Sequence, residues 1–327
     1  MSAGAPGETF AHKVDVAIPA YNASGHLAAT LDSVLAQQLP PATLLRIYVT
    51  DDASTDGLQK LLRDKYAGLV TWAVHPANKG RSAACNTAIG LGDGDVVVVL
   101  DADCRLADVT MIRRILDHLD AGADAVIGTV DAEGAGFWQK YAGVVSRRRV
   151  AAAKRDGPWH MTTANFAVRR ERLSELNGFS ERYRHYGFED RDLLVRLART
   201  GARVVVDERI VVLHREPASV REVCEKLYQS GRYPASEFAA NFPDIYARSF
   251  YSHLDLSRYR KTAGLLEPVI RAFYAVSNAA SDALIRSKWA GFGLQATCLR
   301  ITSALGYLLG TCHAAREAPR KQPTIAT

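Results

Sequence analysis

The sequence has few cysteines, and none in a pattern that disulfides or zinc would require. They are odd in number and far apart: Cys85, Cys104, Cys224, Cys298 and Cys312. No Cys-x-x-Cys pair occurs, and this distribution favours a reducing compartment over a disulfide framework. A chain of 327 residues can bury a large core without such cross-links. We therefore expect a cytoplasmic protein.

Long hydrophobic runs are also missing. Residues 1–13 hold no apolar segment of signal-peptide length, and we expect them to form a flexible leader. Residues 289–312 are nearly uncharged, but Arg300 stands in their middle, whereas a membrane span needs ~20 strongly apolar residues. We expect this segment to lie at an interface or within the protein rather than to cross a bilayer.

The excess of positive charge is absent from most of the chain. Residues 255–327 contain ten Lys or Arg and four Asp or Glu, which accounts for the whole formal charge of +6. A nucleic-acid-binding protein would carry its basic patch on the main fold, so nucleic acid is not an expected partner. The same segment has an apolar stripe at helical spacing, formed by Leu265, Leu266, Val269, Ile270, Phe273 and Val276. Peripheral contact with the inner face of an anionic membrane, a homodimer interface and a helical cap on the main fold all fit this composition.

Strand and helix patterns alternate over the first two hundred residues. Strands are predicted at 14–19, 44–49, 69–74, 96–100, 124–130 and 203–206, and helices after Ser24 and near 57–67, 80–91, 107–121, 136–152 and 189–200. This alternation predicts right-handed strand-helix-strand units and a parallel sheet. From about residue 216 only helices are predicted, over 219–232 and 263–312. We expect an α/β domain at 14–215 and a helical region at 216–327.

The run Val96–Leu100 ends abruptly in Asp101-Ala102-Asp103. A continuous valine run is typical of a strand buried on both faces, and ligands of such sheets bind at the carboxyl ends of the strands. If the strand continued, Asp101 and Asp103 would point to the same side, where a divalent cation on phosphate oxygens would offset their repulsion. The alternative is an Asx-rich turn that only ends the strand.

Six short motifs follow one another along residues 14–214. They are Val16–Asn22, Asp51–Gly57, Asn78–Arg81, Asp101–Asp103, Asn177–Phe179 and Gly187–Leu193. In this order they resemble glycosyltransferase family 2. The resemblance implies a GT-A fold, with a Rossmann-like, mostly parallel sheet flanked by helices, followed here by a C-terminal helical extension. It also implies an inverting transferase that moves a sugar from a nucleotide diphosphate-sugar, with UDP expected, to the hydroxyl of a glycan, a lipid-linked acceptor or a small molecule.

The resemblance further implies a donor site. The residues that would bind the nucleotide-sugar are Ala20, Tyr21, Asp52, Lys79, Arg81, Asp101 and Ala102. Tyr21 would lie against the nucleoside and Asp52 would accept a hydrogen bond from the base. Other interpretations stay open: Tyr21 as core packing, Asp52 as part of a helix-capping cluster, and Lys79 with Arg81 as solvated charges.

A metal site and a catalytic pair complete the implied chemistry. Asp103, Asp101 and His214 would ligate Mn²⁺ or Mg²⁺ on the diphosphate. Asp190 would act as general base on the acceptor hydroxyl, and Glu189 would position the acceptor. Capping of a helix by the two acids is the alternative.

Two other classes compete with a transferase. Sugar-nucleotide pyrophosphorylases share the sheet and the Asp-x-Asp element, but they open with a glycine-rich loop where this chain has Ala20-Tyr21-Asn22. A non-catalytic scaffold of the same fold would be free to lose its acidic residues, whereas this chain keeps Glu189 and Asp190.

Overall fold

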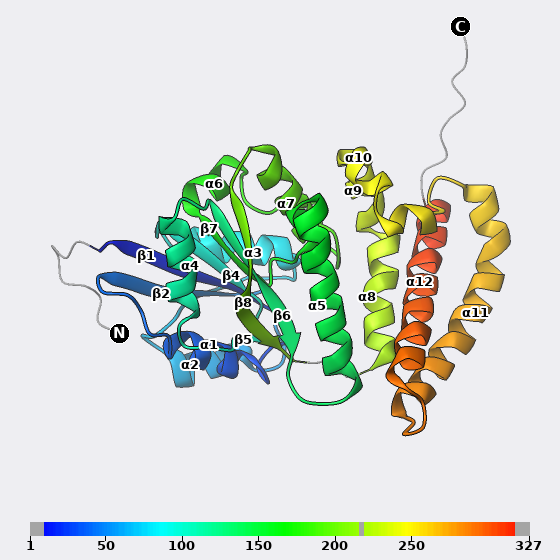
Figure 1. The fold of residues 1–327 in the computed structure, drawn as a ribbon, viewed down its shortest axis with the longest axis horizontal. Coiled ribbons are helices and arrows are strands. Elements are labelled where there is room, and N and C mark those ends of the chain that lie inside the picture. The colour runs from blue at the N-terminus through cyan, green and yellow to red at the C-terminus, as the bar shows by residue number, and fades with distance from the viewer. Residues whose placement is uncertain (1–9, 216–218, 318–327) are drawn as a thin grey trace, which may run out of the picture. The chain divides into compact units, whose positions relative to one another are not determined.

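One eight-stranded sheet organises the first of the two units into which the computed structural model divides (Figure 1). The structure describes residues 10–215 and 219–317. The strands are β1 (His12–Ala20), β2 (Thr43–Asp51), β3 (Thr71–Val74), β4 (Val96–Leu100), β5 (Cys104–Leu106), β6 (Ala125–Ala132), β7 (Asn165–Arg169) and β8 (Val204–His214). Their order in the sheet is β3-β2-β1-β4-β7-β6-β8-β5. The four strands from β3 to β4 are parallel, β7 is antiparallel to both its neighbours, β6 and β8 are parallel, and β5 is antiparallel to β8.

Helices cover both faces of this sheet (Figure 1). One face packs against α1 (Leu27–Leu35), α2 (Leu58–Tyr66) and α4 (Met111–Asp120). The other packs against α3 (Arg81–Gly90), α5 (Phe137–Asp156), α6 (Arg170–Glu175) and α7 (Glu189–Arg199), with the short 3-10 turn Pro158–His160. In β4, Val98 points into the first core and Val97 into the second, which explains the unbroken valine run.

The second unit is helical. It contains α8 (Val220–Arg232), α9 (Pro234–Asn241), α10 (Pro243–Ala247), a 3-10 turn (Phe250–Leu254), α11 (Arg260–Arg286) and α12 (Phe292–Glu317). Helices α11 and α12 bury Ile270, Leu309 and Cys312 between them. Gly310 lets α12 approach α8 closely, because a Cβ there would collide with the Tyr228 carbonyl. Within the described residues, no helix is long and apolar enough to span a bilayer.

The predicted α/β class is confirmed, with several corrections to its elements. The sequence does not predict strands β5 and β7, because β5 is only three residues long and β7 has only three apolar residues between Asn165 and Arg169. Strand β8 joins the segment predicted at 203–206 to the strand run expected at Ile210–Leu213, just before His214, in one continuous strand. β1 begins at His12, inside the expected leader, of which residues 1–9 lie outside the described part of the chain.

Two further expectations fail for local reasons. The segment predicted as helical over 263–312 forms two helices, α11 and α12, with a break after Arg286 across which the Gln295 side chain donates to the Leu284 carbonyl at 3.0 Å. Asp101 and Asp103 do not continue β4. The chain turns after Leu100, with the Cys104 N–H donating to the Asp101 carbonyl at 3.0 Å. The predicted turn therefore exists, and the two carboxylates face different neighbours.

A glycine sits where β6 and β8 change register. The pairing shifts between Ile127 and Thr129, and a Cβ on Gly128 would collide with the Asn165 side chain and the Ile210 carbonyl. Asn165 donates from Nδ2 to the carbonyls of Thr129 and Ile210, each at 3.0 Å. The bulge thus needs a residue without a side chain.

Gly128→Ala should therefore destabilise the protein by about 1–3 kcal/mol, because its methyl group displaces a buried amide that bonds two strands. Urea unfolding would measure the change. Gly90→Ala is the matched control, since nothing lies within 4 Å of the added Cβ and the site is at a helix end. Equal stabilities for the two variants would contradict this account of the bulge.

Candidate functional site

The residues singled out from the sequence gather where parallel strands end. Ala20 ends β1, Asp52 follows β2, and Asp101 follows β4. Arg81 is the first residue of α3. Because β2, β1 and β4 are neighbours in the sheet, these positions share one edge of the first unit, as expected for a ligand site of an α/β sheet.

Arg81 is the centre of a polar cluster. Its Nε and Nη2 donate to Asp101 Oδ1 at 3.0 and 2.7 Å, and its Nη1 donates to Asp190 Oδ1 at 3.0 Å. The guanidinium also bonds the Thr163 hydroxyl at 3.2 Å and lies 5.7 Å from the centre of the Phe179 ring. Arg81 is therefore neither a solvated charge nor a core residue. It joins the end of β4 to the start of α7.

Thr162 and Thr163 hold the second carboxylate from the other side. The Thr162 hydroxyl donates to Asp190 Oδ2 at 2.7 Å, and the Thr163 hydroxyl donates to Asp190 Oδ1. Neither threonine was identified from the sequence, because both immediately precede the unpredicted strand β7 and no motif marks them. These two hydrogen bonds and the ion pair to Arg81 hold the Asp190 side chain in place. Asp190 therefore does more than cap its own helix.

The cluster sets different proton affinities for adjacent acids. Burial raises the pKa of Glu189 to about 7, and the charge of Asp190 adds to this effect. Burial also acts on Asp190, but Arg81 and the two threonine hydroxyls outweigh it and lower the pKa of Asp190. Burial raises the pKa of Asp101 against the opposing effect of Arg81, with Asp103 and Asp190 contributing further. Burial disfavours the charged form of Arg81, yet the carboxylates of Asp101 and Asp190 keep its pKa well above the ordinary value.

Asp103 and His214 form a separate pair, two residues from Asp101. Asp103 Oδ2 lies 3.0 Å from His214 Nε2, and both side chains are partly exposed. Strand pairing explains this approach, because Cys104 in β5 is opposite His214 in β8. The Arg215 N–H donates to the Asp103 carbonyl at 3.1 Å, so the backbone next to His214 is also bonded to Asp103.

A carboxylate beside an imidazole fits a divalent cation, although these two groups do not complete its coordination. Among the described residues, no three His, Cys, Asp or Glu side chains are grouped closely enough to hold a metal ion by themselves. Asp101 is turned to Arg81. Further oxygens would have to come from a ligand such as a diphosphate, as is usual for Mg²⁺.

Asp52 is a buried anchor for the segment that leads into α3. Its Oδ1 accepts from the Lys79 N–H and its Oδ2 from the Gly80 N–H, each at 2.9 Å, and His75 Nδ1 lies 2.6 Å from Oδ1. Asp52 does not cap the following helix α2, where Asp56 Oδ1 instead accepts from the Leu58 N–H. His75 was not singled out from the sequence.

The remaining donor-site candidates differ in exposure. Tyr21 is 52% exposed, so core packing is wrong for this residue. The Lys79 side chain is also exposed. Ala20 and Ala102 are buried, and their carbonyls accept from the Asp52 N–H and the Thr30 hydroxyl, each at 2.8 Å. These two alanines therefore shape the backbone around the site.

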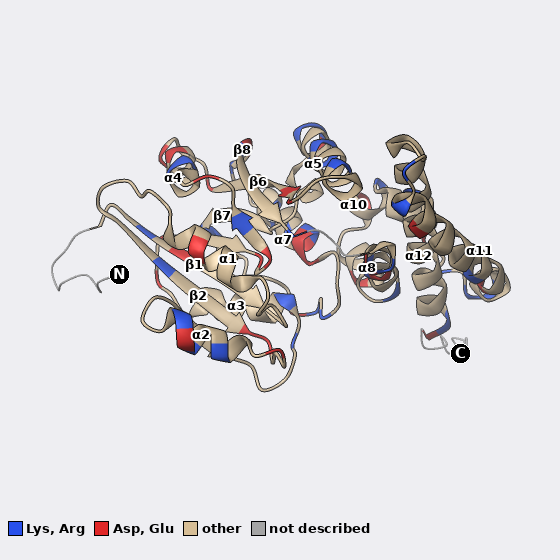
Figure 2. Ribbon diagram, turned by 90° about the horizontal axis from the view of Figure 1, so that it is seen from below, with Lys and Arg blue, Asp and Glu red and all other residues tan. Residues whose placement is uncertain are grey.

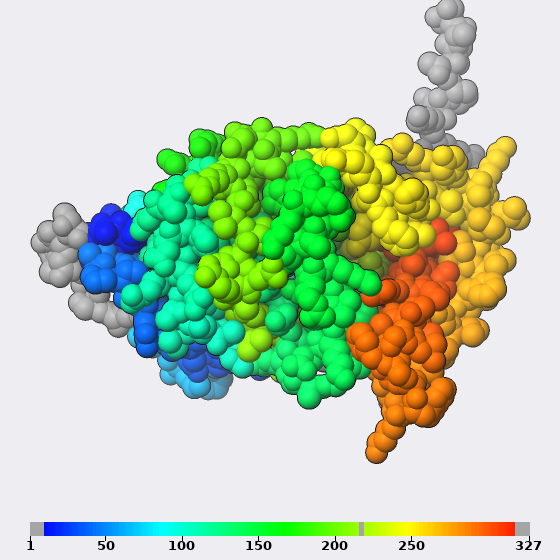
Figure 3. All heavy atoms as spheres, in the orientation of Figure 1, coloured from blue at the N-terminus to red at the C-terminus, as the bar shows by residue number. Residues whose placement is uncertain are grey.

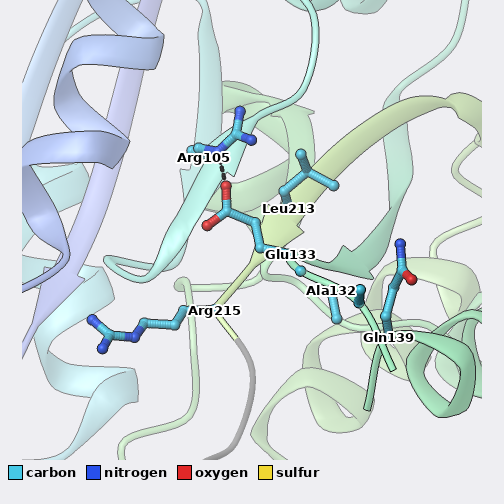
Figure 4. Close-up of a pocket in the computed structure, with 8 residues that line it drawn as sticks. Arg105, Ala132, Glu133, Gln139, Leu213 and Arg215 are labelled. Carbon is cyan, nitrogen blue, oxygen red and sulfur yellow. Dashed lines mark hydrogen bonds and ion pairs between the residues drawn. The ribbon is translucent and has the colours of Figure 1, made fainter. Parts of the chain in front are cut away.

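An open pocket of about 600 Å³ lies where β6 and β8 end, next to β5 (Figure 4). It is lined by Arg105, Ala132, Glu133, Gly134, Ala135, Gln139, Leu213 and Arg215. Arg105 and Glu133 form an ion pair, and Arg215 extends away from Gln139 (Figure 4). Leu213 and Arg215 are the chain neighbours of His214, whose own side chain is not part of the lining.

Family comparisons cover most of the first unit. Residues 15–176 match the family described as glycosyl transferase family 2, and residues 148–211 match one described as the N-terminal domain of galactosyltransferase. An uncharacterised glycosyltransferase of Escherichia coli K12, YaiP, is 28% identical over 64% of this chain and 53% of its own length. A probable glycosyltransferase of Bacillus subtilis 168, YdaM, is 26% identical over 63% of this chain and 51% of its own length. The chain spans about half the length of these relatives.

Solved structures share the fold. The mannosyltransferase PcManGT from Pyrobaculum calidifontis, in complex with GDP-Man and Mn²⁺, has a TM-score of 0.62 at 23% identity, covering 94% of this chain and 88% of its own. Residues 1–349 of S. aureus TarS, in complex with UDP-GlcNAc, have a TM-score of 0.51 at 16% identity, covering 91% of this chain and 90% of their own. At these identities the likeness establishes the fold, a GT-A-like mixed sheet.

Arg81→Met tests the electrostatic account of the cluster. Losing the guanidinium leaves Asp101 and Asp190 without a counter-charge, and the folded state should lose about 1–3 kcal/mol at neutral pH. The pKa of Asp190 should then rise. Because the carboxylates are neutralised by protonation, the stability gap to the wild type should shrink as the pH falls.

Urea unfolding of both proteins across the acidic range would measure this gap. Lys60→Met, which removes an exposed ion pair with Asp64, should leave stability unchanged at every pH. A gap for Arg81→Met that does not vary with pH would mean that the side chain acts by packing alone.

Proposed function

Because the chain belongs to glycosyl transferase family 2, we propose that it transfers a sugar from a nucleotide diphosphate-sugar to a hydroxyl acceptor with inversion at the anomeric carbon. One observation carries the proposal: the turn 101–103 presents Asp101 to the Arg81–Asp190 cluster and Asp103 to His214. These contacts support a site in which the departing diphosphate would lie near Asp103 and the acceptor near Asp190. The names of the matched relatives support a transferase over a nucleotidyltransferase or a scaffold.

The donor would lie across the ends of β1, β2 and β4. The exposed Tyr21 ring is available to stack on the nucleoside, and Asp52 holds the neighbouring backbone, with a base contact still to be tested. Lys79 is exposed beside it. UDP is our expected nucleotide. The matched structures contain GDP-Man in one case and UDP-GlcNAc in the other, so a panel of nucleotide-sugars should decide the base and the sugar.

Asp103 and His214 would hold Mn²⁺ or Mg²⁺, with Asp101 close enough in the chain to contact the ribose or a metal-bound water. When bound, such an ion neutralises the charge that the diphosphate gains as it leaves. Asp103 supplies a hard carboxylate oxygen, and His214, held by strand β8, supplies an imidazole nitrogen. The two atoms lie 3.0 Å apart, which is about the separation of two adjacent ligands of an octahedral ion at ~2.1 Å.

The general base would come from the start of α7. We propose Asp190, whose lowered pKa keeps it ionised throughout the neutral range and whose carboxylate is 20% exposed. Removal of the acceptor proton by Asp190 would let the acceptor oxygen attack the anomeric carbon opposite the leaving diphosphate. Glu189 is a second candidate, because a pKa of about 7 suits proton transfer at neutral pH. If Asp190 is the base, we propose that Glu189 positions the acceptor.

The acceptor itself remains to be identified. The acceptor hydroxyl must come within hydrogen-bond reach of the general base, so we propose that the acceptor binds at the start of α7, where Glu189 and Asp190 lie.

The metal assignment is tested by calorimetric titration of UDP and GDP with and without Mn²⁺. Asp103→Ala should remove the metal dependence of binding, and His214→Ala should weaken it to a smaller degree, because a carboxylate contributes charge as well as a ligand. Glu175→Ala, a change in an exposed acid of α6, is the control and should bind as the wild type does. Unchanged metal dependence in His214→Ala would remove His214 from the ligand set.

The base assignment is tested by turnover and its pH profile. Asp190→Asn should lower kcat by roughly 10²–10⁴-fold while nucleotide affinity stays nearly intact, because the base acts on the acceptor. Glu189→Gln should mainly raise the KM for the acceptor.

The pH profile of kcat distinguishes the two acids, because it rises near pH 7 for one and is level for the other. If ionised Glu189 is the base, the wild-type rate rises with pH through about 7 and Glu189→Gln abolishes that rise together with turnover. If Asp190 is the base, its lowered pKa keeps kcat level across the neutral range. A kcat that rises through pH 7, with turnover lost in Glu189→Gln, would assign the role of general base to Glu189.

A further inference from the structure

Helix α11 exposes one long apolar face. Leu265, Val269, Phe273 and Val276 are 78%, 53%, 64% and 71% exposed, and Leu266 is 39% exposed beside them. Their spacings of three and four residues put them on one side of the helix. The smaller exposed residues Ala272, Ala280 and Ala283 fall on the same side and extend this face toward the end of the helix.

The unit's own core does not use this face. Ala263, Ile270 and Ser281, on the opposite side of α11, are buried and take part in the packing with α12. Ser281 bonds the Thr302 hydroxyl of α12 at 2.8 Å. Contiguous large apolar side chains on a surface usually mark a site of interaction. The helix has 27 residues and is about 40 Å long. Its apolar stripe is therefore a candidate interaction surface.

The charges around the stripe identify the partner's chemistry. Lys261 and Lys288 are exposed near the two ends of α11, and Tyr259 and Trp289 are 62% and 79% exposed next to them. Figure 2 shows Lys and Arg along the helix. The acids of α11 are already paired: Glu267 is buried with Arg271 and His313, and Asp282 lies 3.0 Å from Arg286. Apolar residues flanked by cations, with aromatic rings at the ends, fit the boundary of an anionic bilayer.

A second copy of the chain fits this face less well. In a symmetric dimer formed through α11, the same residues meet each other, and Lys261, Lys288 and their neighbours would face like charges. An anionic lipid surface neutralises them instead. In the space-filling view α11 forms one edge of the helical unit (Figure 3).

We propose that α11 is a membrane-docking helix, which lies parallel to an anionic phospholipid surface with Leu265, Val269, Phe273 and Val276 inserted among the headgroups. Lys261 and Lys288 contact the anionic lipids. The proposal is independent of the transfer reaction, since it requires neither donor nor acceptor. It would hold the protein at a bilayer without a spanning segment.

Co-sedimentation of the full chain with vesicles tests the proposal. Binding should be strong to vesicles that contain phosphatidylglycerol, weak to pure phosphatidylcholine, and reduced at high ionic strength because salt screens the charge attraction. Leu265→Asp combined with Phe273→Asp should weaken binding by about tenfold or more, since two inserted side chains become charged. Lys261→Glu combined with Lys288→Glu should remove the preference for anionic lipid.

Matched controls separate docking from folding. Leu69→Asp combined with Val109→Asp adds the same charge at exposed apolar positions of the first unit and should leave vesicle binding unchanged. Thermal unfolding should give the same Tm for Leu265→Asp with Phe273→Asp as for the wild type, because both side chains are exposed. Light scattering without lipid reports the oligomeric state. Full recovery of the wild type in the supernatant under every condition, or a dimer that only the α11 substitutions dissociate, would overturn the proposal.

Discussion

The ion pairs of Arg81 with Asp101 and Asp190 connect the parts of the candidate site. Arg81 begins α3, Asp101 follows β4 and Asp190 lies in the first turn of α7, so one guanidinium joins segments that are far apart in the sequence. A planar group with several donors can bond two carboxylates and a hydroxyl at once, which a lysine could not do with the same geometry. The orientation of both acids therefore depends on this one side chain.

The same cluster gives neighbouring carboxyl groups different pKa values. Asp190 is surrounded by Arg81 and two threonine hydroxyls and has a lowered pKa, whereas the adjacent Glu189 is buried beside a negative charge and has a raised one. On the other side of the 101–103 turn, Asp103 faces His214 rather than an arginine. A single short turn thus divides an acid that is paired with an arginine from one that lies beside an imidazole.

The helical unit has a different balance of forces. Its helices approach closely through glycine, and its core is small, while the most apolar exposed side of α11 takes no part in that core. Exposed leucine and phenylalanine lower solubility and add no stability to the unit that carries them. Their presence between cations fits the membrane-docking role proposed for α11.

Local patterns in the sequence determined much of the first unit. The valine run, the helix periodicities and the acidic triplet predicted buried strands, flanking helices and a polar site at the end of β4, because burial on two faces leaves a direct trace in composition. The motif resemblance pointed to Arg81, Asp103, His214, Glu189 and Asp190 as site residues, and the structure brings them to one edge of the sheet in two clusters.

Only the tertiary structure decided which partner each residue has. That Asp101 pairs with Arg81 while Asp103 pairs with His214 follows from the turn after β4, which the sequence offered as one of two alternatives, and from the pairing of β5 with β8, which has no distinct sequence pattern. The roles of Thr162, Thr163 and His75 were equally hidden, since contacts between segments distant in the chain leave no periodicity. The apolar stripe of α11 was visible in the sequence, but its exposure depends on which side of the helix packs against α12. Composition records burial, whereas pairing and exposure are set by long-range packing.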